Sequence, residues 1–169
     1  MECFSKHPAP KGRISVNNLM FIFVFTLSHL IAYTVAGVIA LNISQDIYES
    51  RNRLCNFLRD MSDSEESRHV KKYFFPAQLI RGVLMASVLL PLINTISAFS
   101  FLERFIFFAG LMFVFTHFAA VSPFIDNIEG FVYFKNKYLQ KKAFLKFQLE
   151  MILYSLLFAS LLSASYFLF

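Results

Sequence analysis

The stretch that decides the fold is NLMFIFVFTLSHLIAYTVAGVIAL, residues Asn18–Leu41, which contains no Asp, Glu, Lys or Arg. At 1.5 Å rise per residue, about 20 apolar residues cross a hydrocarbon core about 30 Å thick. Three further runs reach that length with at most one charged residue each, namely Pro76–Phe99, Phe105–Phe124 and Phe147–Phe169. The sequence therefore predicts an all-α integral membrane protein, built as a bundle of four transmembrane helices.

The composition supports a membrane protein with one domain. Hydrophobic residues make up 57% of the 169-residue chain and charged residues 16%, below the roughly 25% of a soluble domain. The segments between the four runs are too short for a second folded domain. The net charge of +5 comes from basic residues that flank the apolar runs, so it favours anionic lipid headgroups over nucleic acid as a partner.

Two sequence features exclude simple alternatives. Cys3 and Cys55 are too few for a disulfide framework and lack the spacing of a zinc site. The first apolar run is longer than the apolar core of a signal peptide and is not followed by a small-residue cleavage site. We therefore expect it to be an uncleaved membrane anchor.

The distribution of Lys and Arg predicts the orientation. If the runs form hairpins, the N-terminal tail, residues 100–104 and the C-terminus share one side with 4 basic residues, and the other side has 12. The positive-inside rule then places loops 42–75 and 125–146 in the cytosol and both termini on the non-cytosolic side, in a bacterial inner membrane or an equivalent membrane. The basic residues nearest the first run favour the reverse, three before it against two after it.

The segment after the first run has an amphipathic pattern. Its apolar residues fall on one helical face and its arginines on the other; the apolar set is Ile43, Ile47, Leu54, Leu58 and Met61. We expect an amphipathic helix here that lies on the inner membrane surface or against the bundle.

Two charged residues interrupt the apolar runs at similar depth. Arg81 lies about five residues inside the second run, and Glu150 lies near the start of the fourth. A charge at the centre of a membrane costs about 2.5–3.5 kcal/mol, which an ion pair across the bundle would offset. The alternative is that Arg81 extends to the lipid phosphates and Glu150 bonds to water. The pair is also a candidate site for an anionic substrate.

A repeated Asp-x-x-Glu spacing offers a candidate metal site. Asp46 and Glu49 follow the first run, and Asp126 and Glu129 follow the third. Residues three apart share a helix face, so the two pairs could converge on a divalent cation such as magnesium, manganese or calcium. The many nearby Lys and Arg residues could neutralise the same carboxylates without a metal, and this is the favoured alternative.

Two histidines near the middle of the first and third runs are a candidate haem site. His29 and His117 lie at similar depth, which is the minimum requirement for a bis-imidazole haem b. The alternative is that each forms a hydrogen bond with a neighbouring polar residue such as Ser28, Thr116 or Tyr33. We predict no resident cofactor and keep the divalent cation and haem b as hypotheses.

Small residues recur every four positions in two runs and predict close helix packing. The first run contributes Ala32, Ala36 and Ala40, and the fourth contributes Ser155, Ala159 and Ser163. In lipid, such faces let helix backbones approach closely, within one chain or between copies.

The function expected from the sequence is non-enzymatic, because no catalytic motif is present. We expect a small subunit or accessory protein that binds another membrane protein or forms a homo-oligomer. The first alternative is a membrane-embedded enzyme or transporter with an anion, lipid-headgroup or metal site at the cytosolic leaflet. It would use Arg81 with the five carboxylates Asp46, Glu49, Asp126, Glu129 and Glu150. The second is a haem b electron-transfer subunit with His29 and His117 as ligands.

Overall fold

The computed structural model describes residues 16–49, 54–122 and 124–168, and these residues form helices and connecting turns without any strand. The α-helices are α1 (Val16–Ile43), α2 (Gln45–Tyr48), α3 (Ser64–Leu89), α4 (Ile93–Ala98), α5 (Phe101–Gly110), α6 (Ile128–Tyr133) and α7 (Lys141–Ala164). The other helical segments are 3-10 turns at Leu90–Leu92, Asn136–Tyr138 and Ser165–Leu168, and the π-helix η2 at Leu111–Phe118, which continues α5.

Four helical segments are long and apolar enough to cross a membrane, as the sequence predicts. They are Val16–Ile43, Ser64–Ala98, Phe101–Phe118 and Lys141–Ala164. Three of the eight boundaries differ from the prediction by six residues or more. The second segment begins at Ser64 rather than Pro76, the third ends at Phe118 rather than Phe124, and the fourth begins at Lys141 rather than Phe147.

The earlier start of α3 comes from its N-terminal cap. The carboxylate of Asp63 accepts hydrogen bonds from the backbone N–H groups of Glu65 and Glu66, both at 2.9 Å. This cap satisfies N–H groups that have no partner inside the helix, so the polar segment after it is helical too. Pro76 therefore lies inside α3 rather than in the first turn of a helix.

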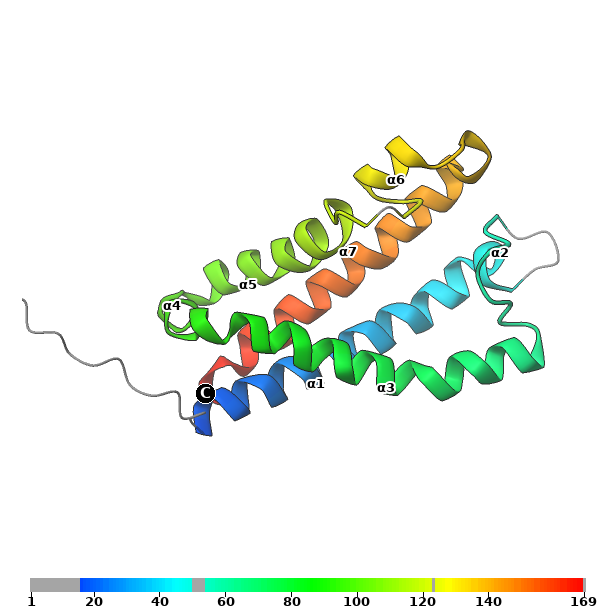
Figure 1. The fold of residues 1–169 in the computed structure, drawn as a ribbon. Coiled ribbons are helices and arrows are strands. Elements are labelled where there is room, and N and C mark those ends of the chain that lie inside the picture. The colour runs from blue at the N-terminus through cyan, green and yellow to red at the C-terminus, as the bar shows by residue number, and fades with distance from the viewer. Residues whose placement is uncertain (1–15, 50–53, 123, 169) are drawn as a thin grey trace, which may run out of the picture.

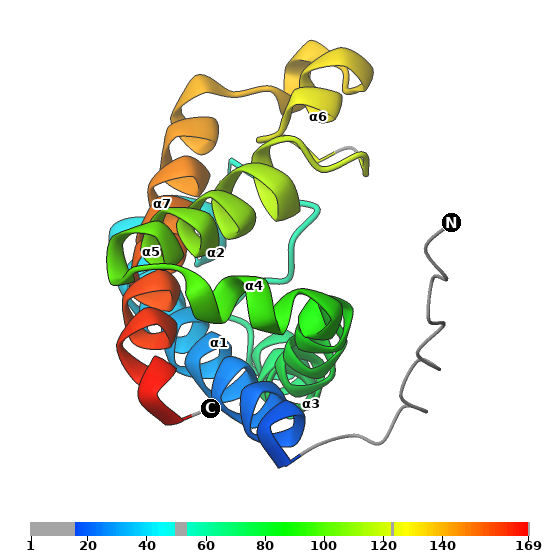
Figure 2. The same cartoon turned by 90° about the vertical axis from the view of Figure 1, so that its left-hand side faces the viewer.

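The four apolar segments pack in the order α3, α1, α7, α5 (Figure 1). α1 contacts α3 on one side and α7 on the other, and α7 contacts α5, but α3 and α5 make no comparable contact. Seen from the end in Figure 2, α4 bridges α3 and α5. We call that end of the bundle the turn end and the end with α2 and α6 the loop end. α3 and α5 come together at the turn end and diverge toward the loop end.

The main core combines buried residues of all four apolar segments. Phe25 is fully buried and meets the rings of Phe158 and Phe108 edge to face, with centroids 4.9 and 6.4 Å apart. The predicted small-residue faces lie in the same interior: Ala32, Ala36, Ala40, Ser155, Ala159 and Ser163 are all buried. These residues therefore join helices within one chain.

The predicted amphipathic helix after the first run is not a continuous helix in the described residues. α2 ends at Tyr48, residues 50–53 lie outside the description, and the chain beyond them forms turns. It folds back on itself, because the N–H of Leu54 bonds to the carbonyl of Asp46 at 2.9 Å and that of Met61 to the carbonyl of Tyr48 at 2.8 Å. Of the predicted apolar face, Leu54 and Leu58 pack against a second core at the loop end, whereas Ile43 is exposed. This core is formed by Ile47, Cys55, Ile125, Ala143 and Phe147.

Candidate functional site

Polar side chains meet in the middle of the bundle around His29, which is fully buried in α1. Its Nδ1 lies 2.7 Å from the hydroxyl oxygen of Tyr154 in α7, and its Nε2 lies 3.1 Å from the amide oxygen of Gln78 in α3. The hydroxyl oxygen of Tyr154 also lies 3.4 Å from the sulfur of Met112. One imidazole thus connects three helices through contacts that burial makes costly to break.

Arg81 lies in α3, three residues after Gln78, and extends into the same interior. Its guanidinium carbon is 5.9 Å from the centroid of the Tyr33 ring on α1, a cation–π contact. It is also close enough to act electrostatically on His29, His117 and Tyr154. Among the described residues Arg81 has no carboxylate within ion-pair distance.

Glu150, the expected partner of Arg81, is engaged by a different residue. The hydroxyl of Tyr48 in α2 donates to its Oε2 at 2.8 Å. Burial and the Glu150 carboxylate raise the pKa of Tyr48 above the ordinary range of a phenol, so Tyr48 keeps its proton and remains a donor. The structure thus places both members of the predicted pair inside the bundle but does not join them.

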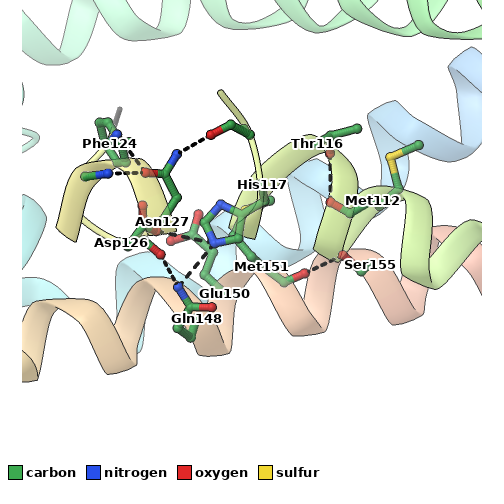
Figure 3. A network of polar contacts seen from close by, with 12 residues as sticks. Met112, Thr116, His117, Phe124, Asp126, Asn127, Gln148, Glu150, Met151 and Ser155 are labelled. Atoms are coloured by element: carbon green, nitrogen blue, oxygen red, sulfur yellow. Dashed lines mark hydrogen bonds and ion pairs between the residues drawn. The ribbon is translucent and has the colours of Figure 1, made fainter. Parts of the chain in front are cut away.

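Another cluster of polar side chains lies near the loop end of the bundle, where η2 meets α7 (Figure 3). His117 of η2 has its Nε2 3.5 Å from the Oδ2 of Asp126 and 3.3 Å from the amide nitrogen of Gln148. That amide donates to the backbone carbonyl of Asp126 at 2.5 Å. Asp126 is 1% exposed, and burial raises its pKa to about 6. The group therefore contains a buried carboxyl that changes charge near neutral pH.

The geometry of η2 helps to place His117. In a π-helix each backbone N–H bonds five residues back, and the N–H of Ala119 bonds to the carbonyl of Val114 in this way at 2.8 Å. Such segments are rare and occur frequently at functional sites.

The turn that carries Asp126 is held by its neighbour Asn127. Its Oδ1 accepts from the N–H groups of Gly130 at 2.7 Å and Phe124 at 3.0 Å, and its amide donates to the carbonyl of Ser122 at 2.7 Å. A Cβ at position 130 would lie 1.4 Å from the carbonyl oxygen of Phe124, so only glycine fits there. These contacts fix the position of Asp126 relative to His117.

The predicted metal ligands do not converge. Asp46 is held by Lys142 and Lys146, whose ammonium nitrogens lie 2.6 and 2.5 Å from its two oxygens. Burial alone would raise the pKa of Asp46, but these two lysines outweigh it and lower the pKa. Glu49 is exposed and Glu129 is partly buried. In the described parts of the chain no three His, Cys, Asp or Glu residues form a group able to hold a metal ion.

The two histidines predicted as haem ligands belong to separate polar groups. Both ring nitrogens of His29 are engaged by Tyr154 and Gln78, which leaves neither free to bind iron in this arrangement. His117 uses its Nε2 toward Asp126 and Gln148. The haem hypothesis stays a prediction, which the presence or absence of a Soret band in the purified protein tests.

Four residues of these groups were not among the predicted site residues, namely Tyr48, Gln78, Gln148 and Tyr154. One signal could have identified the two glutamines, because an amide in an apolar run needs a partner as much as a charge does. The tyrosines carry no such signal, since they are also typical of membrane interfaces.

Comparison of the chain with protein-family models, with curated proteins and with solved structures gave no match. The function must therefore be inferred from the geometry alone.

Proposed function

We propose that this chain is a multi-pass membrane protein that binds an anionic group inside its bundle, with Arg81 as the cation that attracts the anion. The observation that carries the proposal is that Arg81 lies within an apolar helix and has no carboxylate partner among the described residues. An unpaired charge within a membrane is costly and typically marks a substrate or ion pathway. A bound anion would supply the missing counter-charge.

The neighbours of Arg81 suit a binding site. Tyr33 lies beside the guanidinium and contributes a hydroxyl group, which does not compete with an anion as a carboxylate would. The nearer carboxylates are engaged elsewhere, Glu150 by Tyr48 and Asp126 by the His117 group. The arrangement supports a transporter or an enzyme that acts on an anionic substrate. In the orientation predicted from the basic loops, this substrate would reach Arg81 from the cytosolic side.

The accessory role expected from the sequence gains no specific support from the packing. The small-residue faces that were expected to contact a partner are buried within the bundle of this chain. Purification in a gentle detergent, followed by identification of stoichiometric partners, tests that role.

Thermal unfolding of the detergent-solubilised full chain tests the proposal, with inorganic phosphate and glycerol 3-phosphate as probes at constant ionic strength. A ligand that binds only the folded state stabilises it by about 2.7 kcal/mol at a concentration 100 times its Kd. We expect both anions to raise the melting temperature of the wild type but not that of Arg81→Gln. Arg68→Gln is the matched control, because Arg68 is exposed on the same helix.

The variant itself is informative. Because Arg81 forms no ion pair in the described structure, we expect Arg81→Gln without ligand to melt close to the wild type. Equal stabilisation of Arg81→Gln and wild type by the probes, or no stabilisation of the wild type, contradicts the proposal.

A further inference from the structure

An apolar groove of about 280 Å³ runs between α3 and η2. Residues of both helices line it, including Leu84, Met85 and Val88 from α3 and Leu111, Phe115 and Thr116 from η2. Val88 and Phe115 are 76% and 75% exposed, so the groove opens sideways, away from the bundle axis. It exists because α3 and α5 pack on α1 and α7 rather than on each other.

Arg81 does not line this groove but lies on α3 one helical turn beyond its loop-side end. Arg81 precedes Leu84 by three residues and Met85 by four, so it shares their face of α3 one turn nearer the loop end. On the opposite wall, His117 directly follows Thr116. The printed contact of the Arg81 guanidinium is with the ring of Tyr33 on α1, 5.9 Å from the guanidinium carbon to the ring centroid. The groove is thus apolar along its length, with a positive charge one turn beyond its loop-side end.

We propose that this groove takes one acyl chain of an anionic lipid whose headgroup binds Arg81. The inference rests on the proposed function and names the class of its ligand. The charge complements an anionic headgroup, and the apolar walls complement a chain. The groove is near the lower limit of ligand pockets, about 300 Å³, which suits one chain rather than two. Because the groove opens sideways, the lipid enters from the bilayer without crossing the loops.

Native mass spectrometry of the purified full-length protein tests this proposal, with two lipid probes that carry the same palmitoyl chain. Palmitoyl lysophosphatidic acid carries a phosphate, and monopalmitoylglycerol does not. We expect the wild type to retain the phosphate-bearing lipid in preference to the neutral one. Arg81→Gln should lose this preference.

A second variant fills the groove without changing charge. Leu84→Trp places an indole in the groove, and we expect it to weaken binding of palmitoyl lysophosphatidic acid at least ~10-fold, about 1.4 kcal/mol. Leu79→Trp is the matched control, because Leu79 is similarly exposed on α3, 53% against 62% for Leu84, and does not line the groove. Leu84→Trp should still be stabilised by glycerol 3-phosphate, which has no chain.

The outcomes separate the two proposals. If Leu84→Trp retains palmitoyl lysophosphatidic acid like the wild type, or if the wild type binds monopalmitoylglycerol equally well, the lipid inference is overturned while the Arg81 site stands. If Arg81→Gln responds to glycerol 3-phosphate like the wild type, the proposed function itself fails.

Discussion

The Nδ1 of His29 lies 2.7 Å from the hydroxyl oxygen of Tyr154, and the two residues are 125 positions apart in the chain. Both side chains are almost completely buried, at 0% and 1% exposure. This contact joins the two central helices at the level of Gln78. Each residue has a second polar contact, His29 with Gln78 and Tyr154 with Met112, so the His29–Tyr154 bond links these contacts across the bundle.

The first prediction concerns this contact. Tyr154→Phe keeps the ring but leaves the Nδ1 of His29 without its partner, so we expect a loss of about 1–3 kcal/mol in the free energy of unfolding. Thermal unfolding followed by circular dichroism measures it. Tyr33→Phe is the control, since no described residue accepts from or donates to that hydroxyl and its ring contacts remain. An equal loss in the two variants would contradict the assigned role of Tyr154.

The second prediction concerns Tyr48 and Glu150. Tyr48→Phe removes the donor to a carboxylate that lies inside the bundle. We expect a loss of about 1–3 kcal/mol, and substantial recovery when Glu150→Leu is added, because replacing both partners with apolar groups leaves no unsatisfied atom. Melting temperatures of the two single variants and the double variant measure the coupling. Tyr133→Phe, at a position 70% exposed, should have no effect. Additive losses in the double variant would argue against the contact.

The third prediction follows from the raised pKa of Asp126, about 6 against 3.8 for an ordinary Asp. Between these values the folded state binds a proton that the unfolded state has lost. Stability therefore falls as pH rises through this window and is level above it. Asp126→Asn removes the cost of burying an ionised carboxylate. We therefore expect this variant to be more stable than the wild type at pH 7 by about 2–3 kcal/mol, at 1.36 kcal/mol per pKa unit.

Melting temperatures measured from pH 4 to pH 7 test this prediction, with the gap between Asp126→Asn and wild type widening as pH rises. Asp126 also contacts His117 and Gln148, and the substitution leaves both of these residues unchanged. Gln45→Asn, at an exposed position without a titratable group, should show a pH-independent difference. A gap that narrows toward pH 7 would mean that the ionised form of Asp126 stabilises the fold.

The fourth prediction concerns two glycines. Gly130→Ala places a Cβ 1.4 Å from the carbonyl oxygen of Phe124, so the turn held by Asn127 must open. We expect destabilisation and faster proteolysis between residues 119 and 135. Gly37→Ala is the matched control, because nothing lies within 4 Å of a Cβ there and alanine favours a helix by about 1 kcal/mol. Similar proteolysis of the two variants would contradict the structure of this turn.

The four apolar segments could be predicted from the sequence because length and hydropathy depend only on local composition. The boundaries at Ser64 and Lys141 could not, since polar helical residues beyond an apolar run carry no hydropathy signal. The fold-back after α2 was also missed. The helical spacing of Ile47, Leu54 and Leu58 is compatible with a helix, but their burial against Ile125 and Phe147 depends on residues far along the chain.

In the candidate site, too, the residues themselves could be predicted from the sequence but their partners could not. The sequence identified Arg81, Glu150, His29 and His117 because each is costly in an apolar run. It could not supply their partners, since that choice depends on the rotation and depth of neighbouring helices. Glu150 meets Tyr48 rather than Arg81, and Asp46 meets two lysines rather than Asp126.

The central position of α1 and α7 has a consequence for biosynthesis. α1 leaves the ribosome well before α7, so the pair at the centre of the bundle forms late. Gln78 on α3 can bond to His29 as soon as α1 and α3 have packed together, whereas Tyr154 becomes available only with α7. During that interval the Nδ1 of His29 lacks the partner that it has in the complete fold. Chains that stall before residue 154 should therefore be substrates for membrane quality control.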